Sequence, residues 1–189
     1  MSSNLIIRWG GLAAMLSGAL LVVKGAVILV SDADPSLVPL ATLLFALGMV
    51  GLHARLAGRG GLLGTIGLIL AWVAIGASAI NLIAQVLGLT PARAPLPALF
   101  QATYMVAFLA ILLGLLALGI AALRAEVLSP PWRAVPLAVG VLWFPLQVAG
   151  FVAPDGVEII LTALAWTLLG YVLWSGSGAP TEQPTRRVR

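Results

Sequence analysis

Six long apolar stretches, separated by short polar connections, run along the chain. We place them at residues 5–30, 36–56, 61–88, 98–124, 133–153 and 157–175. A helix needs about 20 apolar residues to cross a hydrocarbon core that is roughly 30 Å thick. The pattern therefore predicts an all-α membrane protein, built as a six-transmembrane-helix bundle.

The basic residues predict the direction in which these helices are threaded. Eight of the ten fall at the N-terminus, in the second and fourth connections, or at the C-terminus: Arg8, Arg55, Arg59, Arg124, Arg133, Arg186, Arg187 and Arg189. With six spans, these four places lie on one side of the membrane. Because cytoplasmic loops are enriched in Lys and Arg, we expect an N-in/C-in topology, with both termini in the cytoplasm.

Composition agrees with a single membrane domain. Hydrophobic residues make up 61% of the chain and charged residues 8%, against about 25% charged residues in soluble domains. We expect one transmembrane domain at residues 1–175 and a basic, disordered cytoplasmic tail at residues 176–189. Cysteine is absent, which excludes disulfides, thiolate metal sites and cysteine nucleophiles.

The second and fourth stretches end alike. Ala46-Leu47-Gly48 matches Ala117-Leu118-Gly119 at an offset of 71 residues, and the same offset carries Trp72 onto Trp143. Together with the arginines that open the odd-numbered stretches, this match predicts three helical hairpins related by rotation about the membrane normal. Convergence within an Ala/Leu/Gly-rich sequence is the alternative.

Small residues at intervals of four mark faces where helix backbones approach closely. Gly10, Ala14 and Gly18 form such a ladder in the first stretch, and Gly60 and Gly64 open the third. We expect these faces to pack within the chain. Homo-oligomerisation through one of them is the alternative.

Polar residues within the spans are concentrated toward the predicted outer side, and we take the following as candidate ligand-binding residues: Lys24, Asn81, Gln85, Gln101, Tyr104 and Gln147. At a rise of 1.5 Å per residue, Lys24 lies about 24 Å from Arg8 and Gln147 about 21 Å from Arg133. Both therefore lie within the hydrocarbon, where an ionisable group marks a functional site by default.

Two interpretations of these residues stay open. If their helix faces converge, they line a vestibule that opens outward below Asp155 and Glu158. If they do not, they form a solvated rim. As a separate question, Lys24 either contacts a ligand or anion, or extends toward Asp32 or Asp34 at the surface.

Three tryptophans lie deeper than the interfacial ones, about 12–16 Å from the inner boundary: Trp72, Trp143 and Trp166. A buried indole N–H needs an acceptor. Pro145 leaves the carbonyl of Val141 without its helical donor, which predicts a kink in the fifth span. The three rings form either ordinary packing or an aromatic floor under the vestibule.

Candidate chemistry is otherwise sparse. The single histidine, His53, has no carboxylate near it in sequence, so we expect no metal site and no cofactor. All six acids lie at the predicted membrane surfaces, which argues against a catalytic triad and against an enzyme. The net charge of +4 lies beside the membrane and favours anionic lipid as a partner, with no nucleic acid expected.

Two segments carry a resemblance to known sequences. The segment Ala117–Ala125, which runs on to Pro130, Pro131, Trp132 and Arg133, and the segment Leu168–Ser175 are similar to a group of uncharacterised six-span membrane proteins of the Chloroflexota and actinobacterial type. That resemblance implies a bacterial cytoplasmic (inner) membrane and no particular activity. In size and span count the chain also resembles the substrate-binding subunits of energy-coupling-factor vitamin transporters.

These observations favour a non-enzymatic binding or accessory subunit of a larger membrane assembly, with a membrane-protein partner or a second copy of the chain beside it. The alternative is an outward-facing binder or carrier of a small amphiphilic or vitamin-like solute. In that alternative, Lys24 meets an anionic group on the solute, while Gln147, Gln101 and Asn81 provide hydrogen bonds.

Overall fold

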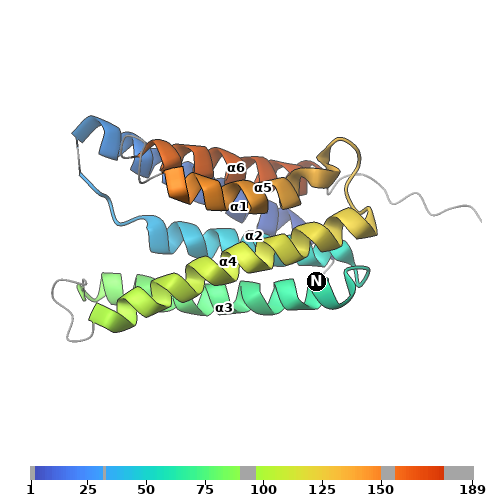
Figure 1. The fold of residues 1–189 in the computed structure, drawn as a ribbon, viewed down its shortest axis with the longest axis horizontal. Coiled ribbons are helices and arrows are strands. Elements are labelled where there is room, and N and C mark those ends of the chain that lie inside the picture. The colour runs from blue at the N-terminus through green and yellow to red at the C-terminus, as the bar shows by residue number, and fades with distance from the viewer. Residues whose placement is uncertain (1–2, 32, 90–96, 150–155, 177–189) are drawn as a thin grey trace, which may run out of the picture.

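The computed structural model describes residues 3–31, 33–89, 97–149 and 156–176. Within them the chain forms six α-helices and one short 3-10 helix, shown in Figure 1: α1 (Ser3–Ser31), α2 (Val38–Leu56), α3 (Gly61–Val86), α4 (Pro97–Ala125), η1 (Trp132–Ala134), α5 (Val135–Ala149) and α6 (Val157–Ser175). These bounds lie within a few residues of the predicted stretches, which confirms the all-helical architecture. The predicted end of the fifth stretch and nearly all of the tail lie outside the described residues.

Five of these helices are long and apolar enough to cross a bilayer: α1, α2, α3, α4 and α6. Large apolar side chains are exposed along them, such as Leu62 (76%) and Ile83 (60%), which is the arrangement expected where lipid is the solvent. The protein is therefore a multi-pass membrane protein. The remaining apolar helix, Trp132–Val148, is shorter than a typical span, so the count of six spans stays a prediction.

Helix α2 occupies the centre of the bundle and packs against α1, α3, α4 and α6. Its inward face is fully buried at Phe45, Met49, Leu52 and Leu56. The chain therefore folds as one bundle around α2. Helices α5 and α6 contact each other less extensively than the pairs α1–α2 and α3–α4 do, and the hairpin repeat stays a prediction.

The small-residue ladder of α1 packs within the chain, as expected. A Cβ on Gly10 would lie 2.6 Å from Cα of Gly51, so the backbones of α1 and α2 touch there. One on Gly18 would lie 2.6 Å from the carbonyl oxygen of Ala163 in α6. Glycine at these two positions is what allows α1 to lie directly against both neighbours.

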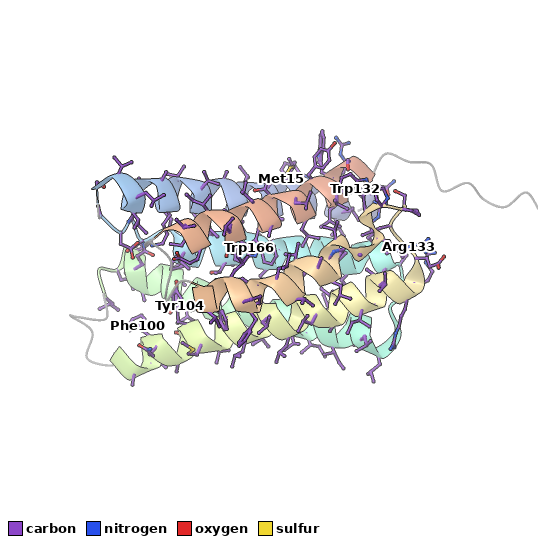
Figure 2. All side chains as sticks on the ribbon, turned by 45° about the horizontal axis from the view of Figure 1, so that its top comes forward. Met15, Phe100, Tyr104, Trp132, Arg133 and Trp166 are labelled. Carbon is purple, nitrogen blue, oxygen red and sulfur yellow. The ribbon has the colours of Figure 1, made fainter. Side chains whose placement is uncertain are left out.

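The two ends of the bundle differ in charge. We call one the basic end: it holds the start of α1, the α2–α3 turn, the α4–η1 connection and the end of α6, with Arg8, Arg59, Arg124 and Arg133. The opposite, acidic end holds the α1–α2 connection and the start of α6, with Asp34 and Glu158. Figure 2 shows Trp132 and Arg133 toward the basic end and Phe100 and Tyr104 toward the acidic end. This separation is the structural counterpart of the alternating charge pattern in the sequence.

Candidate functional site

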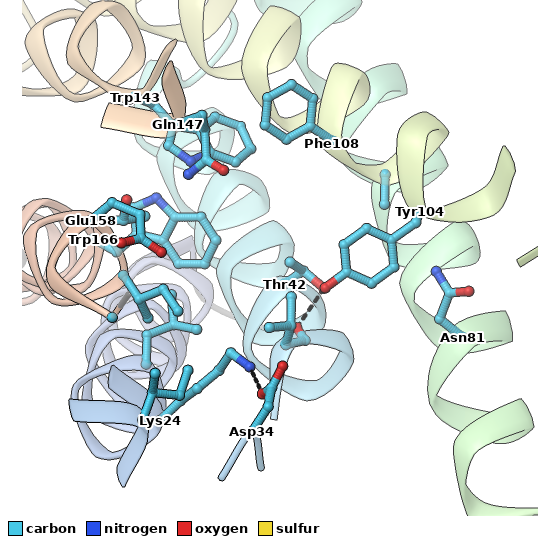
Figure 3. Close-up of a pocket in the computed structure, with 17 residues that line it drawn as sticks. Lys24, Asp34, Thr42, Asn81, Tyr104, Phe108, Trp143, Gln147, Glu158 and Trp166 are labelled. Carbon is cyan, nitrogen blue, oxygen red and sulfur yellow. Dashed lines mark hydrogen bonds and ion pairs between the residues drawn. The ribbon is translucent and has the colours of Figure 1, made fainter. Parts of the chain in front are cut away.

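A cavity of about 510 Å³ lies among the helices toward the acidic end. This volume is in the range of sites that hold a small organic molecule, about 300–1,000 Å³. Every one of the six α-helices contributes to its wall, which includes these polar residues: Lys24, Asp34, Thr42, Asn81, Tyr104, Gln147, Glu158 and Thr162. Figure 3 shows Glu158 and Trp166 on one side of the cavity, Tyr104 and Asn81 on the other, and Lys24 beside Asp34.

Aromatic rings form the deeper part of the wall. Trp143 of α5 and Trp166 of α6 meet edge to face, with ring centroids 5.7 Å apart and planes at 68°. Phe108 of α4 packs against Trp143 at 4.8 Å between centroids. The cavity therefore joins a polar rim at the acidic end to an aromatic surface below it.

Several buried polar atoms in this wall have no hydrogen-bond partner among the described residues. They are Nε1 of Trp143, Nε1 of Trp166, Oγ1 of Thr162 and Oε2 of Glu158. The side chains of Trp143, Thr162 and Trp166 are 4%, 4% and 2% exposed. Because buried polar groups are nearly always paired, four free atoms on one cavity point to an occupant, either water or a ligand.

Three polar residues in the first half of α6 share one helix face. Glu158, Thr162 and Trp166 follow one another at intervals of four residues, so they lie one above another along the helix. Trp143 and Gln147 have the same spacing on α5. Because residues four apart share a helix face, the packing of α5 and α6 brings all five side chains to the cavity together.

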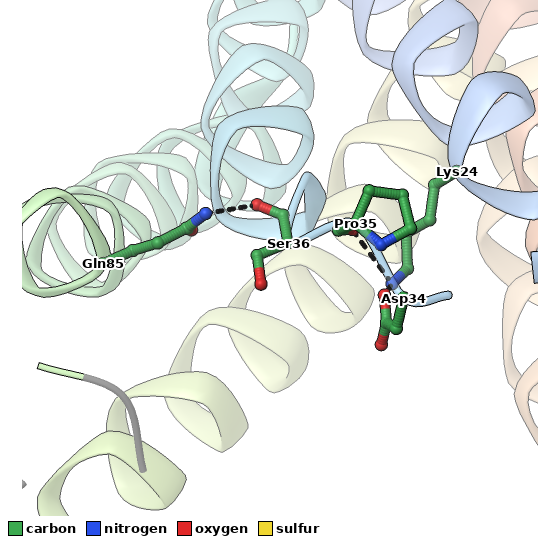
Figure 4. A network of polar contacts seen from close by, with 5 residues as sticks. All are labelled: Lys24, Asp34, Pro35, Ser36 and Gln85. Carbon is green, nitrogen blue, oxygen red and sulfur yellow. Dashed lines mark hydrogen bonds and ion pairs between the residues drawn. The ribbon is translucent and has the colours of Figure 1, made fainter. Parts of the chain in front are cut away.

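Lys24 is an internal cation with a partner on the connection that precedes α2. Its side chain is 6% exposed and forms an ion pair with Asp34, whose side chain is 70% exposed. Nζ of Lys24 also donates to the carbonyl of Pro35 at 3.4 Å. Figure 4 shows this network, in which Lys24 reaches toward Asp34 as one of the two predictions for this residue expected.

Two of the other candidate residues form hydrogen bonds between separate segments of the bundle. Nε2 of Gln85 donates to the carbonyl of Ser36 at 2.6 Å, which ties α3 to the α1–α2 connection (Figure 4). Oδ1 of Asn81 accepts a hydrogen bond from Thr103 of α4 at 2.8 Å. These contacts give both amides a structural role at the acidic end.

All six candidate residues lie around two neighbouring cavities. Lys24, Asn81, Tyr104 and Gln147 line the larger one, and Gln85 and Gln101 line a second one of about 370 Å³ that shares Lys24, Asn81 and Tyr104 with it. The predicted convergence of their helix faces is thus the arrangement in the structure. That they bind a ligand stays a prediction. The candidate neighbour Asp155 lies outside the described residues.

The tryptophan prediction holds only in part. Trp143 and Trp166 lie together under the polar rim, whereas Trp72 is 58% exposed on the outward face of α3 and takes no part in the wall. Helix α5 continues through Pro145. The Trp143 indole does not use the carbonyl that Pro145 frees, since its N–H has no partner in the described part of the chain.

Three further wall residues were not predicted from the sequence, Thr42, Thr162 and Phe108, and neither was the shared position of Glu158 and Trp166 in this wall. In chemical terms the wall provides indole and hydroxyl donors, a carboxylate with a free oxygen, and one paired ammonium. Among the described residues, no group of three His, Asp or Glu side chains lies close enough to hold a metal ion. The arrangement is suited to hydrogen bonding and apolar contact.

No protein-family model matches the sequence, and no similar protein was found among curated proteins or solved structures.

Proposed function

We propose that the protein binds a small amphiphilic solute in the 510 Å³ cavity. One observation carries this proposal: three side chains in the wall are more than nine-tenths buried, and their polar atoms have no hydrogen-bond partner among the described residues. They are Trp143, Thr162 and Trp166. Each unpaired buried donor costs about 1–3 kcal/mol. A molecule that presents acceptor atoms to these groups would recover that free energy on binding.

The composition of the wall argues for an amphiphile. Apolar side chains such as Leu21, Ile159 and Phe108 line it together with the tryptophans, while the polar rim lies at the acidic end. A molecule with an apolar body and a polar head would bury its body against the rings and keep its head at the rim. Sites for small organic ligands typically combine an apolar lining with a few placed polar groups in this way.

We further propose that the bundle crosses a bacterial cytoplasmic membrane six times, N-in/C-in, so that the cavity faces outward. The arginines of the basic end support this orientation, because Lys and Arg favour the cytoplasmic side. Under it, the protein takes its solute from outside the cell, as a binding or carrier subunit would. Anionic lipid would then lie against the basic end.

The interpretation as an accessory subunit of a larger membrane assembly stays a prediction and receives less support. It depended in part on small-residue faces that could meet another protein. The ladder Gly10, Ala14 and Gly18 instead meets α2 and α6 within the chain. The free polar atoms in the cavity wall, by contrast, are best explained by an occupant that pairs with them.

The proposal is tested by filling the cavity. Ala107 of α4 is 4% exposed and lines the wall, so Ala107→Phe would occupy the space; Ala102→Phe, on an exposed position of the same helix, is the matched control. We measure phenylbutanol binding by equilibrium dialysis against lipid nanodiscs with and without the protein. Ala107→Phe should weaken binding more than about tenfold (about 1.4 kcal/mol) and Ala102→Phe should not. Equal binding by both variants, or none above empty nanodiscs in the wild type, would overturn the proposal.

A further inference from the structure

We infer that the polar head of the solute is a cationic amine, held by the carboxylate of Glu158 beside the aromatic wall. The inference rests on the proposed function and assigns the ligand's charge. It replaces the expectation from sequence that Lys24 binds an anionic group of the solute. The observation behind this inference is that one cavity wall holds a carboxylate with a free oxygen, Glu158, and a lysine that is already paired, Lys24.

Lys24 is the only cation in the described part of the wall, and it has a partner. Its ammonium is joined to Asp34 and to the carbonyl of Pro35 (Figures 3 and 4). An anionic ligand would have to displace Asp34 from a buried ammonium. Separating a buried ion pair leaves an uncompensated charge, so the exchange gains little.

Glu158 is in the opposite situation. Its Oε2 is buried and has no partner among the described residues. It interacts with Lys24 electrostatically but forms no ion pair with it within the described structure. The charged groups of the wall are one ammonium, Lys24, and two carboxylates, Asp34 and Glu158. The net charge of the wall is therefore −1. A carboxylate in such a place is best satisfied by a charged hydrogen-bond donor.

The neighbourhood of Glu158 also suits a cation with an apolar body. Trp166 lies two helical turns further along the same face of α6, and both side chains line the cavity. Aromatic side chains provide a large apolar surface on which the body of such a cation can pack. Trp143 and Phe108 extend the aromatic surface toward α4. The remaining titratable group of the wall, the Tyr104 phenol, faces the cavity from the other side and can accept or donate a hydrogen bond.

The test compares three probes with the same aromatic body: phenylbutylamine, phenylbutanol and phenylbutyrate. Binding to the wild-type protein in neutral-lipid nanodiscs is measured by equilibrium dialysis, with empty nanodiscs as the reference for partition into lipid. We expect the amine to bind about tenfold more tightly than the alcohol, and the butyrate to bind least, because hydrogen bonds to charged groups are stronger than neutral ones. Failure of all three probes to bind would overturn the proposed function and the inference together. Binding of the alcohol without a preference for the amine would overturn only the inference.

Two carboxamide variants locate the charge. Glu158→Gln keeps the shape of the wall and removes its unpaired charge, so affinity for the amine should fall to that for the alcohol, while affinity for the alcohol stays. Glu126→Gln is the control, since Glu126 lies at the basic end in an exposed ion pair with Arg133, and it should leave all three affinities unchanged. A preference for the amine that persists in Glu158→Gln would contradict the assignment.

Discussion

The indole ring of Trp166 stacks on the phenyl ring of Phe45, with centroids 3.9 Å apart and planes at 13°. Phe45 is fully buried in α2, the central helix, and Trp166 is 2% exposed in α6. The stack therefore fixes one face of the indole against the core of the bundle. It leaves the other parts of the ring for Trp143 and for the cavity.

Removing the stacking partner should destabilise the protein. Phe45→Ala would leave a cavity beneath Trp166, and we expect the free energy of unfolding to fall by about 3 kcal/mol, the low end for buried Phe→Ala changes. The low end applies because lipid, unlike water, already solvates apolar side chains and mainly packing is lost. Thermal unfolding in mild detergent measures the change. Phe144→Ala, at a position 57% exposed on α5, is the control, and an equal loss in both variants would contradict this role of Phe45.

The positions of the helices could be predicted from the sequence, while the orientation of most helices about their axes could not. The lengths of the apolar stretches, and the Arg, Pro and Gly residues at their ends, predict the bounds of α2 and α6 to within two residues. The depth of Lys24 and Gln147 follows from the same counting. The residues that surround Lys24 and Gln147 cannot be predicted in this way. Their helices, α1 and α5, are largely apolar on every side, so no polar face shows which side is buried. The sequence thus predicts a similar membrane depth for Trp72 and Trp143, but in the fold Trp72 is exposed and Trp143 is buried.

One signal for the missed wall residues was available. Glu158, Thr162 and Trp166 form a stripe of side chains with polar atoms at intervals of four, and the other residues between 157 and 166 are apolar. Such a stripe is costly toward lipid and therefore indicates the inward face. Thr42 and Phe108 had no such pattern, and their place depends on how α2 and α4 pack.

The contact between α1 and α2 should tolerate no side chain at Gly10. In Gly10→Ala the new Cβ would lie 2.6 Å from Cα of Gly51, a backbone atom that cannot move alone. We expect a loss of about 1–3 kcal/mol in the free energy of unfolding, as for other overpacked sites. Gly76→Ala is the matched control in α3, where nothing lies within 4 Å of a new Cβ. It should be neutral or stabilise by up to about 1 kcal/mol through helix propensity. Similar melting temperatures for the two variants would refute the close approach.

The ion pair of Lys24 should control the charge that the cavity presents. In Asp34→Asn the ammonium loses its partner and is left to balance Glu158, so the wall becomes neutral. The preference for phenylbutylamine over phenylbutanol should then fall by about tenfold, with affinity for the alcohol unchanged. Equilibrium dialysis measures both. Asp34→Glu, which keeps the charge, should retain the preference, and a loss of equal size there would show that shape rather than charge is responsible.

The topology can be tested with introduced cysteines, because the chain has none of its own. Ser36 lies exposed in the α1–α2 connection at the acidic end, and Gly58 and Ser129 lie exposed in connections at the basic end. In intact cells, an impermeant thiol reagent should label Ser36→Cys and should label Gly58→Cys and Ser129→Cys only after lysis. Labelling of Gly58→Cys before lysis would reverse the proposed orientation and place the cavity toward the cytoplasm.

The central claim is that a solute reaches the free indole N–H groups of Trp143 and Trp166. The chain has six tryptophans, so a nuclear magnetic resonance spectrum of the protein labelled with ¹⁵N at the indole nitrogens contains one signal for each, assigned by single Trp→Phe variants. When phenylbutanol is added, whose hydroxyl oxygen can accept a hydrogen bond, the signals of Trp143 and Trp166 should shift together and saturate. Those of Trp9 and Trp72, both exposed, should not. Shifts confined to Trp9 and Trp72, with Trp143 and Trp166 unmoved, would show that the probe only dissolves in the surrounding lipid, and would contradict the account.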